Sequence, residues 1–167
     1  MDRVTLHVLE HSKYEYKVYS YLERGSDEMQ YGSPKINLPV GSLMRSKYRE
    51  YPEYHTSGDN LDFVSSESLA ETFDMYLTCF KVIENNHVYE NLIYGEPQLG
   101  KRGLYHNLST VENVRSNFKV LDVITYCDGH NDLLEVADIL GLPMLEIIPM
   151  VKELVKQKIL RIKLVIQ

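Results

Sequence analysis

Residues 24–64 read RGSDEMQYGSPKINLPVGSLMRSKYREYPEYHTSGDNLDFV, and this stretch decides the fold class that the sequence predicts. Residues 38–45 form a strand-like run, and the polar segment 46–62, rich in Tyr, Glu, Pro and Gly, is typical of a surface loop at a strand end. Loops at strand ends are where α/β proteins place their chemistry. The stretch therefore predicts an α/β domain with a candidate site on the loop 46–62.

His55 is the residue of this loop with the clearest chemical potential. Zinc binds neutral imidazole, and a carboxylate on the other ring nitrogen fixes the tautomer and the direction of the ring. Asp59, four residues later, is the nearest such carboxylate. Two interpretations stay open for His55: a zinc ligand, or a loop histidine hydrogen-bonded to Asp59 or Glu53. For Asp59 the alternative is an Asx turn with Gly58.

The segment around His55 resembles the C-terminal part of the zinc-exopeptidase superfamily of aminopeptidases, glutamate carboxypeptidases and glutaminyl cyclases. Their last metal ligand lies in a Tyr-His-Thr/Ser-x-x-Asp segment. GSDEMQY, LPVGSLMR, EYPEYHTS, DNLDFV and GEPQLGKRGLY are similar to one bacterial family that joins an aminopeptidase-like domain to a C-terminal winged helix, often within surface-polysaccharide gene clusters. The resemblance implies a partial zinc-exopeptidase-like α/β sandwich followed by an α+β winged-helix domain.

The resemblance also implies roles for individual residues. His55 matches the metal ligand, and Tyr54 matches a phenol that donates to the oxyanion of the tetrahedral intermediate, although a packed loop aromatic is the alternative. Asp27 aligns with a Ser/Thr-Asp-His segment of zinc exopeptidases, in which Glu28 here replaces the histidine. Asp27 and Asp59 are thus the candidate carboxylates that support the metal ligands.

Arg45 is the candidate for holding a substrate carboxylate, because guanidinium groups pair with carboxylates through two parallel hydrogen bonds. Arg49 has the same capacity, and solvated surface charge is the alternative for both. Catalytic zinc usually has three protein ligands and a glutamate base. In the family these come from segments upstream of the ones present here, so we expect one or two zinc ions in a full-length relative and no tight binding by this chain.

Regular elements are predicted on both sides of the loop. Residues 4–11 predict the end of a helix, and residues 13–23 alternate tyrosine and valine with charge, as half-buried strands do. A helix capped by Ser65 or Ser66 extends to about residue 85. Its apolar residues, at spacings of three and four, form a stripe that can pack on a sheet. They are Leu69, Phe73, Tyr76, Leu77, Phe80 and Ile83.

The C-terminal third predicts a winged helix. Residues 117–126 are helical in pattern, Asp132 can cap a second helix that ends at Gly141, and Pro143 starts a third. Residues 159–166 alternate as a strand, which completes the winged-helix order. The predicted domains are therefore 1–103, the aminopeptidase-like portion, and 117–167, the winged helix, joined by a linker at 104–116.

Charge argues against DNA as the partner of this winged helix. Acidic and basic side chains are equal in number between residues 115 and 167, whereas phosphate binding needs clustered positive charge. The whole chain, with 167 residues and a formal net charge of -6, would also be repelled by nucleic acid and anionic membranes.

Cysteine usage and hydropathy favour a cytoplasmic protein. Cys79 and Cys127 lack a CxxC spacing and are expected to be reduced, buried thiols. No segment approaches the roughly 20 apolar residues of a membrane span, and residues 1–12 lack the apolar core of a signal peptide.

Two functions from different classes follow. The first is the C-terminal portion of a zinc-dependent aminopeptidase-like hydrolase that cleaves peptide or amide bonds with metal-activated water, inactive as this fragment. The second is a non-catalytic protein-interaction or assembly module whose winged helix does not bind DNA. Because half of a doubly wound domain leaves apolar faces uncovered, we expect the chain to bind the missing N-terminal half or to self-associate.

Overall fold

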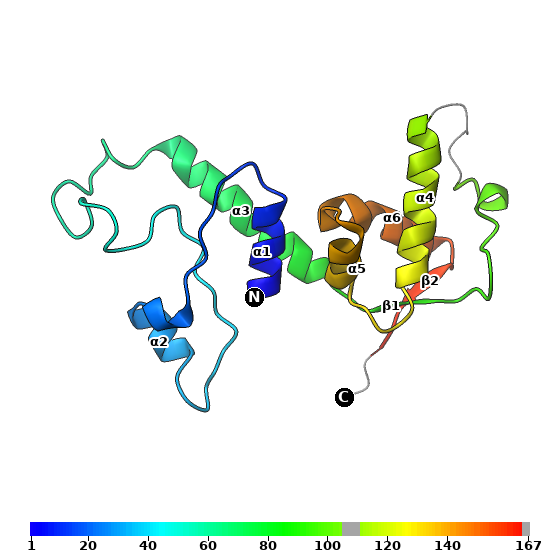
Figure 1. Cartoon of the computed structure of the whole chain (residues 1–167), viewed down its shortest axis with the longest axis horizontal. Helices are drawn as coiled ribbons and strands as arrows, with labels where there is room; N and C mark the ends of the chain where they lie inside the picture. The colour runs from blue at the N-terminus through cyan, green and yellow to red at the C-terminus, as the bar shows by residue number, and fades with distance from the viewer. Residues whose placement is uncertain (105–110, 165–167) are drawn as a thin grey trace. The chain divides into compact units, whose positions relative to one another are not determined.

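The structure, a computed structural model, describes residues 1–104 and 111–164, without the side chains of Ser26 and residues 111–118. The chain forms two compact units, Met1–Lys81 and Val82–Gln167 (Figure 1). The linker predicted at 104–116 includes residues 105–110, which lie outside the described residues, so the predicted domain limits stay predictions. No helix in the described ranges is both long and apolar enough to span a bilayer, and the cytoplasmic location stays a prediction.

The first unit consists of helices joined by long loops. It contains α1 (Asp2–Glu10), the 3-10 helix η1 (Tyr21–Glu23), α2 (Ser26–Tyr31) and most of α3 (Ser66–Asn85). The predicted helix at the position of α3 is confirmed, and Ser65 caps it by accepting a hydrogen bond of 3.1 Å from the Ser68 amide.

Two strand predictions in the first unit are wrong. Residues 13–23 and 38–45 contain no strand, and the segment between them contains α2. A strand needs a neighbouring strand to satisfy its amides and carbonyls, and alternation of side chains does not supply one. Pro39 also removes an amide donor from the second segment. The described part of this unit is helical with loops, and the α/β sandwich stays a prediction.

The second unit has the helices of a winged helix-turn-helix beside a small antiparallel sheet. Its elements are β1 (Tyr89–Asn91), the 3-10 helix η2 (Leu99–Arg102), α4 (Val111–Tyr126), α5 (Leu133–Leu140), α6 (Met144–Lys156) and β2 (Leu160–Ile162). β1 pairs with β2 in the register Tyr89↔Ile162. An ion pair of 2.6 Å between Arg161 and Glu90 crosses the two strands.

The local signals predicted the turn between α5 and α6 correctly. The Asp132 carboxylate accepts a hydrogen bond of 2.8 Å from the Glu135 amide and caps α5. Gly141 ends α5 with a φ of 63°, in the left-handed region that glycine enters without a Cβ penalty. Pro143 is the N-cap of α6, which continues through Pro149.

The three helices of the second unit enclose an apolar core that includes Val123, Val136, Ile147 and Leu154. Both cysteines are buried and free, as the sequence predicts. Burial, with a smaller effect from Asp128, raises the pKa of the Cys127 thiol to about 12, so this thiol stays protonated at neutral pH.

Replacing Ile147 with alanine is expected to destabilise the second unit by about 2–5 kcal/mol, because the side chain is 1% exposed and its loss leaves a cavity. Leu145, two residues earlier on α6 and 38% exposed, is the matched control and should lose less than half as much on the same change. Urea unfolding followed by circular dichroism measures both. Equal losses at the two positions would contradict the packing of α6.

Candidate functional site

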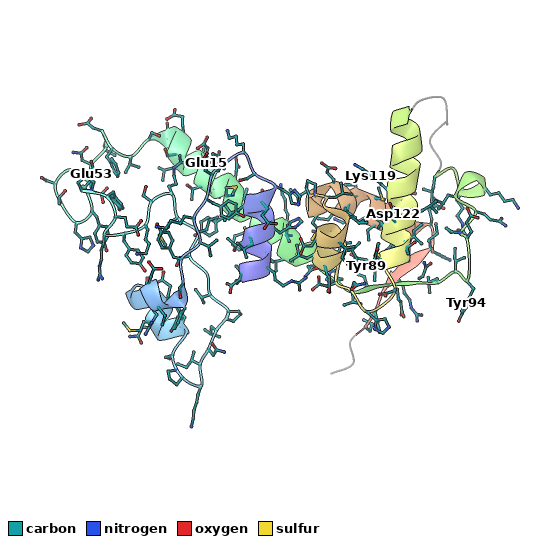
Figure 2. All side chains as sticks on the ribbon, in the orientation of Figure 1. Glu15, Glu53, Tyr89, Tyr94, Lys119 and Asp122 are labelled. Carbon is teal, nitrogen blue, oxygen red and sulfur yellow. The ribbon has the colours of Figure 1, made fainter. Side chains whose placement is uncertain are left out.

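The loop that carries His55 is a succession of tight turns, which Glu53 marks in Figure 2. The Glu53 carbonyl accepts hydrogen bonds from the Thr56 amide, at 3.0 Å, and from the Thr56 hydroxyl, at 2.8 Å. The same hydroxyl accepts from the Gly58 amide at 3.1 Å. His55 therefore lies at the apex of a turn that its neighbours hold closed.

The backbone of His55 has a φ of 58°, in the left-handed region that few non-glycine residues enter. Such conformations concentrate at functional sites, where the surroundings hold them in place. The His55 side chain is exposed. The turn thus presents an imidazole to solvent rather than burying it.

Aromatic stacking supports the His55 ring. It lies on the Tyr54 ring, with centroids 4.0 Å apart and planes 16° from parallel. Tyr54 in turn contacts Tyr51 edge to face at 5.7 Å, and Tyr51 stacks on Phe63 at 5.6 Å. Each pair contributes about 0.5–1.5 kcal/mol beyond the area it buries. The tyrosines of the loop therefore form a base for the imidazole, and Tyr54 is half-buried within it.

Asp59 is exposed in the same loop, and its amide donates to the Thr56 carbonyl at 3.2 Å. Among the described residues, no hydrogen bond joins the carboxylate of Asp59 or Glu53 to the His55 ring. The Asx turn of the loop is made by Asn60, whose side-chain oxygen accepts from the Asp62 amide at 2.8 Å. The supporting role of Asp59 stays a prediction.

Asp27 lies exposed in the first turn of α2, and its predicted role is likewise untested. The neighbouring Glu28, which replaces the histidine of the related proteins, has a structural function here. Its carboxylate accepts hydrogen bonds from the Ser42 hydroxyl and, at 2.9 Å, from the Gly25 amide. The Ser42 bond is the main reason why the pKa of Glu28 is lowered. Glu28 therefore caps α2 and fastens the loop at Ser42 to it.

Arg45, the candidate substrate-binding residue, is paired within the chain. Its Nη1 lies 2.7 Å from Oε2 of Glu71 on α3, and Nζ of Lys13 lies 3.6 Å from the other oxygen. The hydrogen bond from Arg45 is the main cause of the lowered pKa of Glu71. A substrate carboxylate at Arg45 would compete with this ion pair.

The first unit contains a groove that the sequence did not predict, with a volume of about 980 Å³. Arg45 and Glu28 line it, together with Tyr48 and Tyr51, whose rings contact Tyr54. The groove therefore reaches the aromatic base of His55.

Cations lie over the tyrosine rings of this groove. The ammonium groups of Lys17 and Lys47 lie 4.4 Å and 4.9 Å from the Tyr19 ring centroid, and the Tyr19 hydroxyl donates to Glu50 at 2.5 Å. These contacts lower the pKa of Glu50, mainly through the Tyr19 hydroxyl. The tyrosines spaced along residues 14–21 were the available signal for the groove, but their alternation with other residues predicted a strand instead.

A complete metal site is not formed by the described residues. No group of three or more His, Cys, Asp or Glu side chains in residues 1–104 and 111–164 is arranged to hold a metal ion. His55 belongs to no such group, and its role as a metal ligand stays a prediction.

Two family models match consecutive parts of the chain. Residues 1–86 match the family model described as "Domain of unknown function (DUF4910)", and residues 87–162 match a "winged helix-turn-helix" model. The second match confirms the predicted C-terminal winged helix.

Two relatives come from Clostridium acetobutylicum. The chain is 44% identical, over 82% of its length and 32% of the relative's, to a "Putative polysaccharide biosynthesis protein with aminopeptidase-like domain". It is 39% identical to a protein solved as a "putative peptidase", with a TM-score of 0.84, over 97% of this chain and 36% of that one. The chain thus spans about a third of the length of these relatives. With its N-terminal 86 residues matched, the chain belongs to the family described as "Domain of unknown function (DUF4910)", whose relatives carry peptidase-like names.

Proposed function

We propose that this chain forms the C-terminal part of a zinc-dependent aminopeptidase-like hydrolase of the zinc-exopeptidase superfamily, which cleaves peptide or amide bonds. The observation that carries the proposal is the turn at His55. An exposed imidazole, held in a left-handed conformation and stacked on Tyr54, stands in a Tyr-His-Thr-Ser-Gly-Asp segment. The peptidase-like names of the two relatives support it.

In this proposal His55 would supply one ligand to zinc, and the remaining ligands and the glutamate base would come from the rest of the hydrolase. When bound, zinc supplies an activated water for attack on a carbonyl. The Tyr54 hydroxyl would donate a hydrogen bond to the oxygen that gains negative charge during the attack. Because its ring also supports His55, one residue both positions the ligand and serves the reacting carbonyl.

Carboxylates and a guanidinium complete the proposed site. Asp59, four residues after His55 in the same loop, is the proposed support for the second nitrogen of His55, and Asp27 is the corresponding candidate on α2. Arg45 would bind the carboxylate of a peptide substrate at the groove, in exchange for its ion pair with Glu71.

A second function is favoured by the surface of the winged helix. The exposed side chains at the start of α6 are Leu145, Glu146 and Pro149, whereas a DNA-reading helix presents Arg, Asn or Gln there. Lys156, further along, lies 3.4 Å from Glu153. This surface suits contact with protein, so we propose that the second unit is an assembly module that does not bind DNA.

The hydrolase proposal is tested on the complete polypeptide encoded by the gene that contains this sequence. We expect release of the N-terminal residue from short peptides, loss of that activity with 1,10-phenanthroline, and recovery on addition of zinc. An N-acetylated peptide is the matched control and should stay intact, because an aminopeptidase needs the free amine. Activity that survives metal removal would exclude zinc dependence, and failure to cleave any free-amine peptide would exclude the peptidase.

A further inference from the structure

Helix α3 exposes its most apolar face. Five large side chains, here called the α3 stripe, lie on that face with exposed fractions from 36% to 62%: Leu69, Phe73, Tyr76, Leu77 and Phe80. The same helix contacts the first unit through Thr72 and Met75, which line the groove, and through the Tyr76 hydroxyl, which donates to the Leu43 carbonyl at 2.8 Å. A surface helix normally turns its apolar side toward the core. In the described part of the chain, much of this apolar face of α3 is exposed instead.

The first unit has almost no apolar core of its own. Its buried apolar side chains, among those described, are Val4, Val8 and Cys79, whereas the second unit has a full core. Contiguous exposed apolar surface of this kind marks a site of contact with another polypeptide. The sequence predicts a stripe that packs on a sheet, and the described first unit contains no sheet to receive it.

The α3 stripe alone offers too little apolar area for a stable interface between two copies of the chain. Aromatic side chains bury about 150–250 Å² each when fully covered, so five half-exposed side chains offer on the order of 500 Å². A stable interface needs about 800 Å² from each partner. Further apolar side chains of the first unit are also exposed, including Val18, Leu22 and Leu61. A helix pair would leave these uncovered.

The solved relative is longer than this chain. Its structure retains the fold of this chain with a TM-score of 0.84, and this chain accounts for 36% of its length. We infer that the α3 stripe docks the aminopeptidase-like polypeptide that makes up the remainder of such relatives. The inference rests on the proposed function for the nature of this partner, and it assigns the contact chiefly to Phe73 and Phe80, the two phenylalanine rings of the stripe, which are 62% and 53% exposed.

The test mixes this chain with a tagged polypeptide that comprises the part of the 44%-identical Clostridium acetobutylicum protein outside the match. The two are co-expressed, purified through the tag and titrated against each other by calorimetry. We expect the wild-type chain to co-purify, and Phe73→Ser or Phe80→Ser to weaken binding by roughly 30-fold or more, as central aromatic contacts do. Tyr94→Ser, which alters a fully exposed tyrosine of the second unit, is the control and should bind as the wild type does.

Each other outcome overturns the inference. If the wild-type chain does not co-purify, the tagged polypeptide is not its partner. If both serine variants bind as the wild type does, the α3 stripe is not part of the contact. Light scattering that shows a wild-type dimer, split by Phe73→Ser, would identify a second copy as the occupant. The serine variants replace exposed side chains, so their circular dichroism should match that of the wild type.

This experiment separates the docking surface from the proposed catalysis. Binding is measured with a chelator present and needs neither zinc nor hydrolysis. Docking without any zinc-dependent activity would therefore reject the proposed hydrolase and support the interface. Zinc-dependent activity without docking through the stripe would support the hydrolase and reject the interface.

Discussion

His55→Ala in the complete polypeptide is expected to lower kcat/KM for peptide hydrolysis by roughly 10³-fold or more. Metal-assisted stabilisation of the transition state contributes several kcal/mol, and each 1.36 kcal/mol is a factor of ten in rate. The variant should also lose zinc on dialysis, because an exposed loop imidazole cannot be replaced by any neighbouring His or Cys among the described residues. Zinc content by mass spectrometry and steady-state kinetics measure the two effects.

The control for this variant is His130→Ala, which removes another exposed histidine, in the second unit. It should retain both zinc and activity. If His55→Ala keeps its zinc but loses activity, His55 acts on the substrate and not on the metal. If it keeps both, the assignment of a ligand to this turn is wrong and the alternative of a structural loop histidine holds.

Tyr54→Phe is expected to lower kcat by roughly 10²–10³-fold while KM stays within a factor of about two, because an oxyanion donor acts mainly on the transition state. Phenylalanine keeps the ring on which His55 stacks at 4.0 Å, so zinc content should not change. The hydroxyl is the only group removed. The change therefore separates the role of Tyr54 in the reaction from its role as a support.

Tyr51→Phe is the matched control, since Tyr51 belongs to the same aromatic cluster and lines the groove. We expect full activity from it. Equal kcat values for Tyr54→Phe and the wild type would show that Tyr54 is a packed aromatic. A rise in KM with unchanged kcat would assign its hydroxyl to substrate binding instead.

The sequence predicted the second unit well because its signals are local. A cap at Asp132, a glycine at 141 and a proline at 143 each determine the backbone of a few neighbouring residues, and α5 and α6 begin and end accordingly. The pairing of β1 with β2 was missed. It joins residues some seventy positions apart, and no short pattern in a three-residue strand specifies such a partner.

The first unit was predicted less well, because its structure depends on contacts between distant residues. Residues 13–23 and 38–45 alternate like strands, but the described residues provide no partner for them, so they remain loops. The limits of α3 were correct, whereas the prediction that its stripe packs on a sheet depends on polypeptide beyond this unit. Side-chain pattern specifies a helix and its apolar face, and the rest of the structure determines what that face contacts.

The candidate site was likewise predicted only in part from the sequence. The motif around His55 was visible in the sequence, and its left-handed backbone and stacking on Tyr54 were not, because they result from a series of turns and a cluster of rings. The predicted pairing of His55 with Asp59 is not formed in the described loop, and Arg45 has Glu71 as its partner. Residue types indicate which groups can react, but contacts between loops and α3 decide which of them are available.

The most direct test of the account is anomalous X-ray diffraction at the zinc edge, from crystals of the complete polypeptide grown with zinc. We expect an anomalous peak about 2.0–2.1 Å from a ring nitrogen of His55, with the other ligands supplied by residues outside those described for this chain. A zinc peak elsewhere in the protein, with the His55 ring facing solvent and no metal beside it, would contradict the central claim.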